Sequence, residues 1–381
     1  MEKRLELSLE KLRKECEKLE DPRKPGGNTR HALFSILAIP LLAVICGCQE
    51  WIEVEDYGKS KEEWLSTFLD LQNGVPSDDT YRRLFEALKP TQLENLYREW
   101  VRPYVGTCLG KQVAIDGKTV RGASHGWGVE SRLHLLSAWV REDGISMGQL
   151  ATDEKSNEIT AIPTLLESLD INGSTVTIDA MGCQREIAQC IRDGDANYIL
   201  AVKQNQPTLY EEIREYFEWA KTNPIEMKCL DVNEKQAKEH GRETIRRTTV
   251  ANDVRWFESR EKWAGLHCFI MSETTTITNE KTTYETRFYI SSLEASAKNH
   301  AHFIRGHWSI ENQLHWRLDV QFGEDACLIH KGNAPANLSL LRKIALAILK
   351  SDSSVKASVP RKQRLAAYDN SFLQRLLALS E

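Results

Sequence analysis

The chain has 381 residues, enough for two or three domains, and its 41% hydrophobic and 28% charged residues are ordinary for a soluble globular protein. This composition excludes wholesale disorder and a collagen-like fibre. The net charge of −5 means that nucleic acid would have to bind at local basic patches. The 9 cysteines are scattered without a CxxC pair, which favours free thiols in a reducing cytoplasm over a disulfide framework or a zinc knuckle.

The first 105 residues are predicted to be helical. Residues 1–21 are strongly charged, which indicates an amphipathic helix rather than a secretory signal. The apolar run 32–48 is interrupted and slightly short of the roughly 20 residues that span a bilayer, so we interpret it as a buried helix pair. Ser77 is a candidate N-cap for a helix that carries Arg82 and Arg83. Charge alone favours a solvated face over a DNA contact for these two arginines.

After residue 105, short apolar runs alternate with helical stretches. Strands are predicted at residues 113–115, 132–140, 148–152, 175–178 and 198–202, and helices at 161–169 and 186–192. The first run ends in Asp116-Gly117, which is typical of a turn. Three strands followed by strand–helix–strand–helix–strand predict an α/β domain with a mixed sheet.

The last third of the chain departs from this alternation. Thr-rich alternating stretches at 243–250 and 282–290 predict a β-rich insertion at about 220–290, and helices are predicted over 297–318 and 336–350. Between residues 342 and 364 there is one acid, Asp352, against seven Lys or Arg, at positions 342, 343, 350, 356, 361, 362 and 364. The segment 351–381 is therefore expected to be a basic C-terminal tail.

Two aspartates occupy equivalent places in the predicted sheet. Asp116 and Asp179 each follow an apolar strand directly, at the strand end where α/β proteins bind ligands. Mg²⁺ prefers oxygen ligands and is often held by one or two carboxylates. Two such ions about 4 Å apart can stabilise the attacking and leaving oxygens of a phosphoryl displacement. A single Asp-Gly pair is more often a hairpin turn, so the prediction depends on both aspartates.

A third carboxylate is expected from a helix later in the chain. His307, Glu311, His315 and Asp319 recur every four residues, so one helix face carries four potential ligands or proton carriers. Such spacing is also typical of a solvated face, although the neighbouring tryptophans and histidines weaken that interpretation. A zinc site built from His307, Glu311 and His315 is disfavoured, because consecutive turns of one straight helix cannot converge on a tetrahedral centre.

Several motifs now match a known family. The strings AIDGKTVRG (114–122), TIDAMGCQ (177–184), ILAVKQNQP (199–207) and HWSIENQLHWRLDVQFGED (307–325) resemble the DDE transposases of the ISAs-type insertion-sequence family, which includes the H-repeat-associated proteins. DPRKPGGNTRHALFSILAIPLLAVICG (21–47) and GVPSDDTYRRLFEAL (74–88) resemble the helical N-terminal region of that family. The resemblance covers nearly the whole chain, in order.

The resemblance implies an RNase H-like catalytic core at residues 106–350, preceded by a helical, DNA-binding domain at 1–105. It implies that Asp116, Asp179 and Glu311 form the acidic triad and hold two Mg²⁺ or Mn²⁺ ions. The wider superfamily often carries Tyr-x2-Arg-x3-Glu-x6-Lys around this glutamate. Here Ile304, His307 and Leu318 stand at the Tyr, Arg and Lys positions, so their phosphate contacts are not carried over. His307 remains a candidate for phosphate contact or proton transfer.

The expected function is that of a bacterial transposase that cuts the ends of its element and joins the freed 3′ hydroxyl to target DNA, acting on double-stranded DNA as a dimer or larger. The candidate DNA-contacting residues are Lys118, Arg121, Lys203, Asn205, Arg242 and Arg305. A solvated hairpin is the competing interpretation for the first two. Trp127 and Trp139 are weighed as base-stacking residues, with core packing favoured. Three alternatives stay open: a catalytically silent DNA-binding descendant, a metal-dependent nuclease without strand transfer, and an unrelated metal-dependent phosphohydrolase.

Overall fold

The computed structural model describes residues 10, 12–23, 29–120, 133–152, 158–239 and 242–378. Within them, a nine-stranded mixed sheet has the order β3-β2-β1-β4-β5-β9-β8-β7-β6. Its strands are β1 (Gln112–Thr119), β2 (His134–Val140), β3 (Ile145–Thr152), β4 (Thr175–Ile178), β5 (Asn197–Val202), β6 (Asp231–Glu239), β7 (Arg242–Ala251), β8 (Cys268–Ile277) and β9 (Thr282–Ser291). The strands β1, β4 and β5 are parallel, and every other neighbouring pair is antiparallel. The predicted RNase H-like mixed sheet is confirmed.

One predicted turn is wrong. Strand β1 does not end at Asp116-Gly117 but continues to Thr119, paired throughout with β2. Gly117 has no positive φ. A Cβ at this position would instead collide with the side chains of His134 and Glu158, which form a buried ion pair beside it. The glycine is therefore explained by close packing, and Asp116 lies on a strand rather than in a turn.

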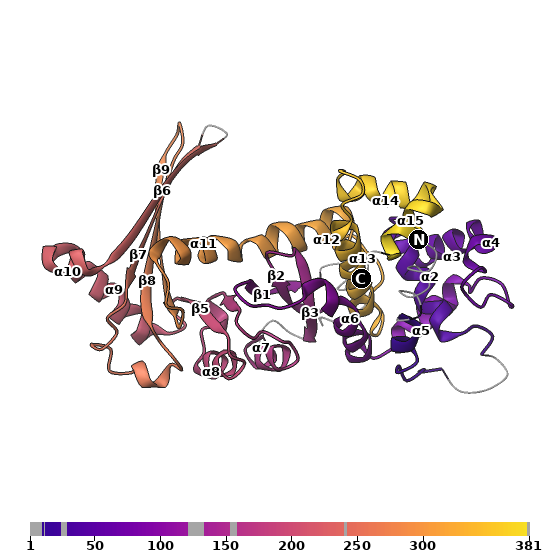
Figure 1. The fold of residues 1–381 in the computed structure, drawn as a ribbon, viewed down its shortest axis with the longest axis horizontal. Coiled ribbons are helices and arrows are strands. Elements are labelled where there is room, and N and C mark those ends of the chain that lie inside the picture. Colours follow the sequence, from indigo (N-terminus) through magenta and orange to yellow (C-terminus); the bar gives the residue numbers. More distant parts are fainter. Residues whose placement is uncertain are drawn as a thin grey trace.

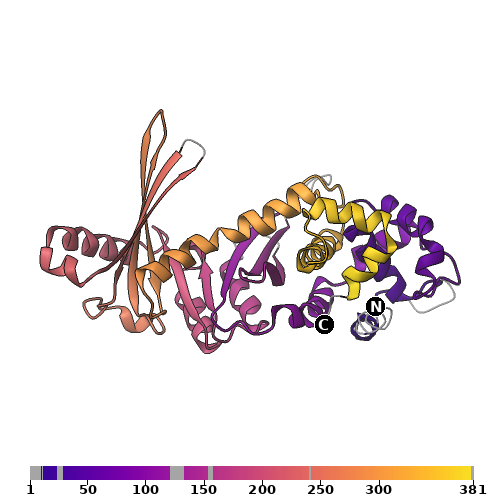
Figure 2. The same cartoon turned by 45° about the horizontal axis from the view of Figure 1, so that its top comes forward.

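Helices cover both faces of the central strands (Figures 1 and 2). On one face, α7 (Glu158–Glu167) contacts β2 and β3, and α8 (Arg185–Asp193) contacts β5. On the other face, α11 (Ala297–His307) contacts β1 and β4. The central strands are consequently buried on both sides, which is why they form continuous apolar runs in the sequence.

The predicted β-rich insertion is confirmed as an antiparallel four-stranded arm, β6 to β9, that extends away from the core (Figure 1). Sequence patterns identified β7 and β9 but missed β6 and β8. Helices α9 (Pro207–Thr222) and α10 (Pro224–Cys229) precede the arm in the chain. Strand β9 pairs with β5, and α11 contacts β6 and β7. The arm therefore joins the core sheet directly, next to β5.

Helices from the two ends of the chain pack together at the opposite end of the molecule (Figure 1). They are α2 (Leu33–Ile45), α3 (Trp51–Ser60), α4 (Glu62–Leu65), α5 (Asp78–Ala87), α6 (Pro90–Val105), α13 (Ala334–Ser351), α14 (Val359–Tyr368) and α15 (Asn370–Ala378). The apolar run 32–48 forms one buried helix, α2, rather than the predicted pair. No helix among the described residues is long and apolar enough to cross a membrane. Helix α13 contacts α2, α5, α6 and β3, and so ties this end to the sheet.

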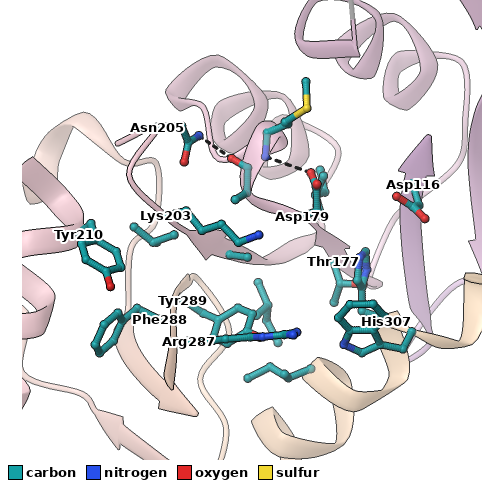
Figure 3. Close-up of a pocket in the computed structure, with 18 of the residues that line it drawn as sticks. Asp116, Thr177, Asp179, Lys203, Asn205, Tyr210, Arg287, Phe288, Tyr289 and His307 are labelled. Carbon is teal, nitrogen blue, oxygen red and sulfur yellow. Dashed lines mark hydrogen bonds between the residues drawn. The ribbon is translucent and has the colours of Figure 1, made fainter. Parts of the chain in front are cut away.

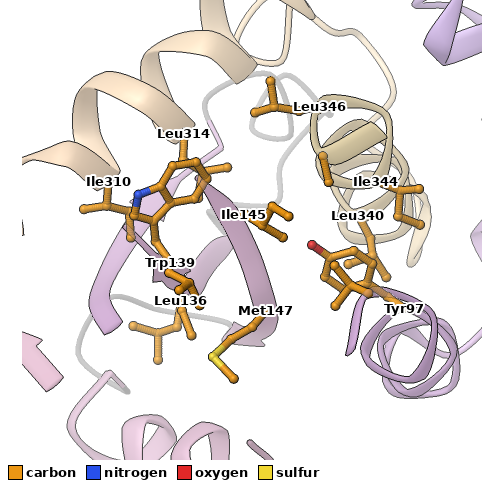
Figure 4. Packing of buried hydrophobic residues seen from close by; sticks show 14 of the residues in the cluster. Tyr97, Leu136, Trp139, Ile145, Met147, Ile310, Leu314, Leu340, Ile344 and Leu346 are labelled. Atoms are coloured by element: carbon orange, nitrogen blue, oxygen red, sulfur yellow. The ribbon is translucent and has the colours of Figure 1, made fainter. Parts of the chain in front are cut away.

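Trp139 lies at the centre of the core, as the favoured interpretation predicted, and is 1% exposed (Figure 4). Ile310 and Leu314, from the helical segment after α11, pack in the same cluster. The Lys350 Nζ lies 4.6 Å from the centroid of the Trp139 ring. Trp127 lies outside the described residues.

Candidate active site

The parallel strands bring the two predicted aspartates to the same edge of the sheet. Ile115 on β1 pairs with Ile178 on β4, so Asp116 and Asp179 follow at equivalent positions on adjacent strands. Lys203 follows β5, the next strand along. These residues line a cavity of about 810 Å³, which His307 and Glu311 also line. Figure 3 shows Asp116, Asp179, Lys203 and His307 around it.

The helix that crosses this edge is not continuous. The predicted helix over residues 297–318 instead consists of α11, a π-helical turn at Glu311–His315 and α12 (Trp316–Gln321). Short π-helical turns inside α-helices are rare and frequently lie at functional sites. This one carries Glu311 at its first residue and His315 at its last.

The structure gathers Asp116, Glu311 and His315 into one group. Their donor atoms all lie within 4.8 Å of one another. The His315 Nδ1 is 3.1 Å from Glu311 Oε2 and 3.5 Å from Asp116 Oδ2. His307, which belongs to the disfavoured zinc set, is not part of this group, and Asp116 from the sheet lies there instead.

The charges of this group are poorly compensated. Burial raises the pKa of Asp116 to about 6; His315 opposes the rise, whereas the neighbouring charge of Asp179 adds to it. Glu311 is more exposed, and its hydrogen bond with His315 lowers its pKa. Among the described residues, no Lys or Arg forms an ion pair with Asp116, Asp179 or Glu311. A carboxylate pair of this kind fits a divalent cation.

Asp179 stands beside the group rather than in it. Its Oδ1 accepts a hydrogen bond of 3.0 Å from the backbone N–H of Met181, and the side chain thereby caps the short helical turn Ala180–Gly182 (Figure 3). This bond engages one of the two carboxylate oxygens. The other oxygen leaves Asp179 able to contribute to a cation site at the same strand edge.

His307 is held by a chain of hydrogen bonds that begins in the sheet. The Gln112 Nε2 donates to Thr177 Oγ1 at 3.0 Å, and Thr177 Oγ1 lies 3.1 Å from His307 Nδ1. The Thr177 hydroxyl, which accepts from the amide, can donate its own proton to Nδ1, and this pairing corresponds to the tautomer with the His307 proton on Nε2. Burial lowers the pKa of His307, although the charge of Asp179 opposes this shift. The lowered pKa favours the neutral ring.

A glycine permits this arrangement. A Cβ at Gly306 would collide with the Gln112 side chain and would approach Arg141. The helix therefore lies close enough to the sheet for Gln112 Nε2 to donate to the Phe303 carbonyl at 2.7 Å. Gly306 thus fixes the distance between the helix and the strands that carry the aspartates.

The predicted DNA-contacting residues are distributed over different environments. Lys203 is exposed at the cavity, without a side-chain partner among the described residues. The Asn205 Nδ2 donates to the Ala180 carbonyl at 2.6 Å, so it braces the turn after Asp179. Lys118, 11% exposed, is ion-paired with Asp319, Glu324 (2.7 Å) and Asp325 (3.6 Å) rather than solvated. Arg121 lies outside the described residues.

Arg305 lines a second groove, of about 1030 Å³, between α11 and the β-arm. The basic residues that line it are Arg141, Lys235, Arg246, Arg287, Lys298 and Arg305. Arg287 and Trp308 line both cavities, so the groove is continuous with the acidic site. The Arg287 guanidinium lies 5.0 Å from the Trp308 ring centroid. Arg242 is exposed and is the first residue of β7.

Sequence reasoning missed three features of this site. His315 was predicted only as one of four potential ligands or proton carriers on a helix face and in a disfavoured zinc set, and its contact with Asp116 was not predicted. Arg287 and Arg141 were not predicted, because no sequence motif distinguishes them. The pairing of β9 positions Arg287, and Arg141 directly follows β2. Of the seven basic residues counted from 342 to 364, Arg342, Lys343 and Lys362 are buried. The expected basic tail contains two helices, α14 and α15, whose apolar residues pack against the core.

Comparison with known proteins gives consistent matches. Residues 109–348 match the model of the transposase DDE domain family, and residues 14–101 match that of the DDE_Tnp_1-associated family. YncI of Escherichia coli O157:H7, named as a candidate transposase, is 38% identical over 98% of this chain and 95% of its own length. YhhI of Escherichia coli (strain K12), named as an H repeat-associated candidate transposase, is 38% identical over 98% of this chain and 99% of its own length. YbfQ of the same strain, named as an inactive transposase, is 36% identical over 16% of this chain and 73% of its own length.

Proposed function

The chain belongs to the DDE transposase family, and on that premise we propose that it cuts DNA at the ends of an insertion sequence and joins the freed 3′ hydroxyl to target DNA. The observation that supports this most strongly is the convergence of Asp116 and Glu311 beside Asp179 at the carboxyl edge of the parallel strands. Three acids from two strands and a helix are otherwise unexplained at one cavity.

In this proposal Asp116, Asp179 and Glu311 hold two divalent cations, Mg²⁺ or Mn²⁺. When bound, such cations stabilise the charge that develops on the attacking and leaving oxygens of a phosphoryl displacement. The carboxylates bind and orient them at the strand edge. Catalysis then depends on positioning and electrostatics, and the protein needs no covalent nucleophile.

His307 has a separate role in the proposal. With its Nδ1 occupied by Thr177, the neutral ring presents the Nε2 proton as a donor. At the cavity it shares with Asp179, this donor suits a phosphate oxygen or the departing 3′ oxygen. His307 would therefore supply part of the phosphate contact that arginine provides in the wider superfamily pattern.

The DNA is proposed to follow the basic groove beside α11. Lys203 lies at the cavity, Arg305 and Lys298 lie along the helix, and Arg242 is the first residue of β7 in the arm. Phosphates neutralised along this path would release counterions, so binding should weaken as salt rises. Lys118 and Asn205 already bind protein acceptors and would shape the site instead. Pairing of two element ends requires at least a dimer in the DNA complex.

The test is a cleavage-and-joining assay on labelled DNA that carries the element ends, with Mg²⁺ or Mn²⁺. We expect Asp116→Asn, Asp179→Asn and Glu311→Gln each to reduce product at least about a thousandfold, which corresponds to about 4 kcal/mol of lost transition-state stabilisation. Asp253→Asn, an exposed acid that pairs with Arg255 away from the site, is the matched control and should retain activity.

The products separate the alternatives. Joined product that requires metal and all three acids supports the transposase. Cleavage without joining would identify a nuclease instead. DNA binding without reaction in either metal, with the element's native ends and host extract supplied, would identify a silent descendant. Activity that survives Glu311→Gln would exclude that residue as the third acid.

A further inference from the structure

We propose that His315 is a nitrogen ligand of the divalent cation that Asp116 and Glu311 hold, and that it biases this site toward a transition-metal ion such as Mn²⁺ over Mg²⁺. The inference rests on the proposed function, because it concerns the same cation site. It adds a ligand that the acidic triad does not contain.

The distances around His315 support a shared ligand set. Two ligand atoms, each about 2.1 Å from one cation and at right angles to each other, lie about 3 Å apart. The His315 Nδ1 is 3.1 Å from Glu311 Oε2 and 3.5 Å from Asp116 Oδ2. Three donor atoms from two chain segments are thus already spaced for a single ion, with only small side-chain movements required.

The burial of His315 argues against a role in solvent or DNA contact. Its side chain is 3% exposed, and its Nε2 is buried without a hydrogen-bond partner among the described residues. A histidine kept only for packing would not direct its one engaged nitrogen at two carboxylates. A ligand role accounts for both the burial and the direction of Nδ1.

Glu311 and His315 are four residues apart, at the two ends of the π-helical turn, and lie on the same side of the helical segment. Leu314, in the same turn, packs in the core with 1% exposure, which anchors the segment against the sheet. Three donors on consecutive turns of one straight helix were not expected to converge on one ion. Here only Glu311 and His315 come from the helical segment, and the third donor comes from strand β1. The Asp116 carboxylate completes it from the opposite side.

The donor set determines the metal preference. Mg²⁺ demands oxygen ligands in near-ideal octahedral geometry, whereas imidazole suits first-row transition metals. A site with two carboxylates and one imidazole should therefore bind Mn²⁺ more tightly than an oxygen-only site does, relative to Mg²⁺. Mn²⁺ is also paramagnetic, so the ligand atom can be identified directly.

The experiment uses the full-length protein with Mn²⁺ and no DNA. Electron spin-echo spectroscopy is expected to show coupling between Mn²⁺ and an imidazole ¹⁴N in the wild type, and to show none in His315→Gln. Titration followed by electron paramagnetic resonance should give at least about tenfold weaker Mn²⁺ binding in His315→Gln. His315→Asp, which restores an oxygen donor, should shift the preference toward Mg²⁺ in competition.

His302→Gln is the matched control, since His302 is an exposed histidine on α11 that contacts Arg141 outside the group. It should keep the nitrogen coupling and the Mn²⁺ affinity. Circular dichroism would verify that each variant folds, and, should His315→Gln fail to fold, His315→Asp serves as the second variant in which the nitrogen coupling should be lost. Absence of Mn²⁺ binding in the wild type, absence of ¹⁴N coupling, or coupling that persists in His315→Gln would overturn the inference. Nitrogen coupling without DNA cleavage would support His315 as ligand while refuting the proposed function.

Discussion

Two charged clusters lie side by side between strand β1 and the chain segment 311–325, and they differ in how their charges are paired. Asp116 and Lys118 are two residues apart on β1 and so face the same side of the sheet. The helical segment across from them supplies Glu311 to the first cluster and Asp319 to the second. The cluster at Asp116 has acids without Lys or Arg partners among the described residues, whereas the cluster at Lys118 pairs each charge.

The pKa values of Asp116 and Glu324, one carboxyl group from each cluster, are shifted in opposite directions. Burial and the nearby charge of Asp179 raise the pKa of Asp116 to about 6, although His315 opposes this. Burial alone would also raise the pKa of Glu324, but Lys118 and Arg342 outweigh it and lower that pKa to about 2. The presence or absence of Lys and Arg partners, rather than burial, therefore distinguishes a cluster of structural ion pairs from a cluster that can bind a metal cation.

The largest effect is expected from breaking the compensated cluster at Glu324, which is 0% exposed. Glu324→Gln leaves Lys118 and Arg342 without their shared acid, and removal of one partner from a buried ion pair costs about 3–5 kcal/mol. Urea unfolding monitored by circular dichroism measures this loss. Glu285→Gln breaks a half-exposed pair with Arg287 and should cost at most about 1 kcal/mol. Equal losses in the two variants would contradict the greater contribution of the buried ion pairs of Glu324 to stability.

The uncompensated cluster should respond in the opposite sense. The pKa of Asp116 is higher in the folded protein than its usual value of 3.8, so its contribution to stability falls as pH rises from about 4 to 6. Asp116→Asn removes this titration and should stabilise the metal-free protein by about 1–3 kcal/mol at pH 7. The gain should disappear below about pH 4.

Urea denaturation of wild type and Asp116→Asn at several pH values, with a chelator present, measures this gain. Added Mn²⁺ should stabilise the wild type but have little effect on the variant, because ligand binding to the folded state raises its stability. A variant that is less stable than the wild type at pH 7 would show that Asp116 has a structural rather than a cation-binding role.

The sequence alone predicted the parts of the two clusters that depend on a local hydrophobic pattern. The strand before Asp179 is buried on both faces and therefore appears as an apolar run, and the acid at its end was predicted from that run. Strand β6, DVNEKQAKE, is a polar edge strand without apolar alternation. Only its pairing with β7 defines it, so sequence periodicity could not reveal it.

Other parts of the site depend on tertiary packing. The turn predicted at Gly117 is wrong because the strand continues against β2, whose buried partners the local sequence does not identify. The π-helical turn likewise has no local signature in the residues that form it. The spacing of four placed His315 near Glu311, but Asp116 lies nearly 200 positions away in the chain, so neither its contact with His315 nor the ion pairs of Lys118 could be predicted from spacing.

The smallest effect should come from Asp319, the outer acid of the compensated cluster. Its side chain is 28% exposed, and burial raises its pKa despite the nearby Lys118, which indicates that its charge gains little from this position. In Asp319→Asn, Lys118 keeps Glu324 at 2.7 Å, so the change in unfolding free energy should stay within about 1 kcal/mol. DNA cleavage should be retained, because Asp319 lies outside the group around Asp116. Loss of cleavage in a normally folded Asp319→Asn protein would place this residue among the catalytic acids and would merge the two clusters into one functional site.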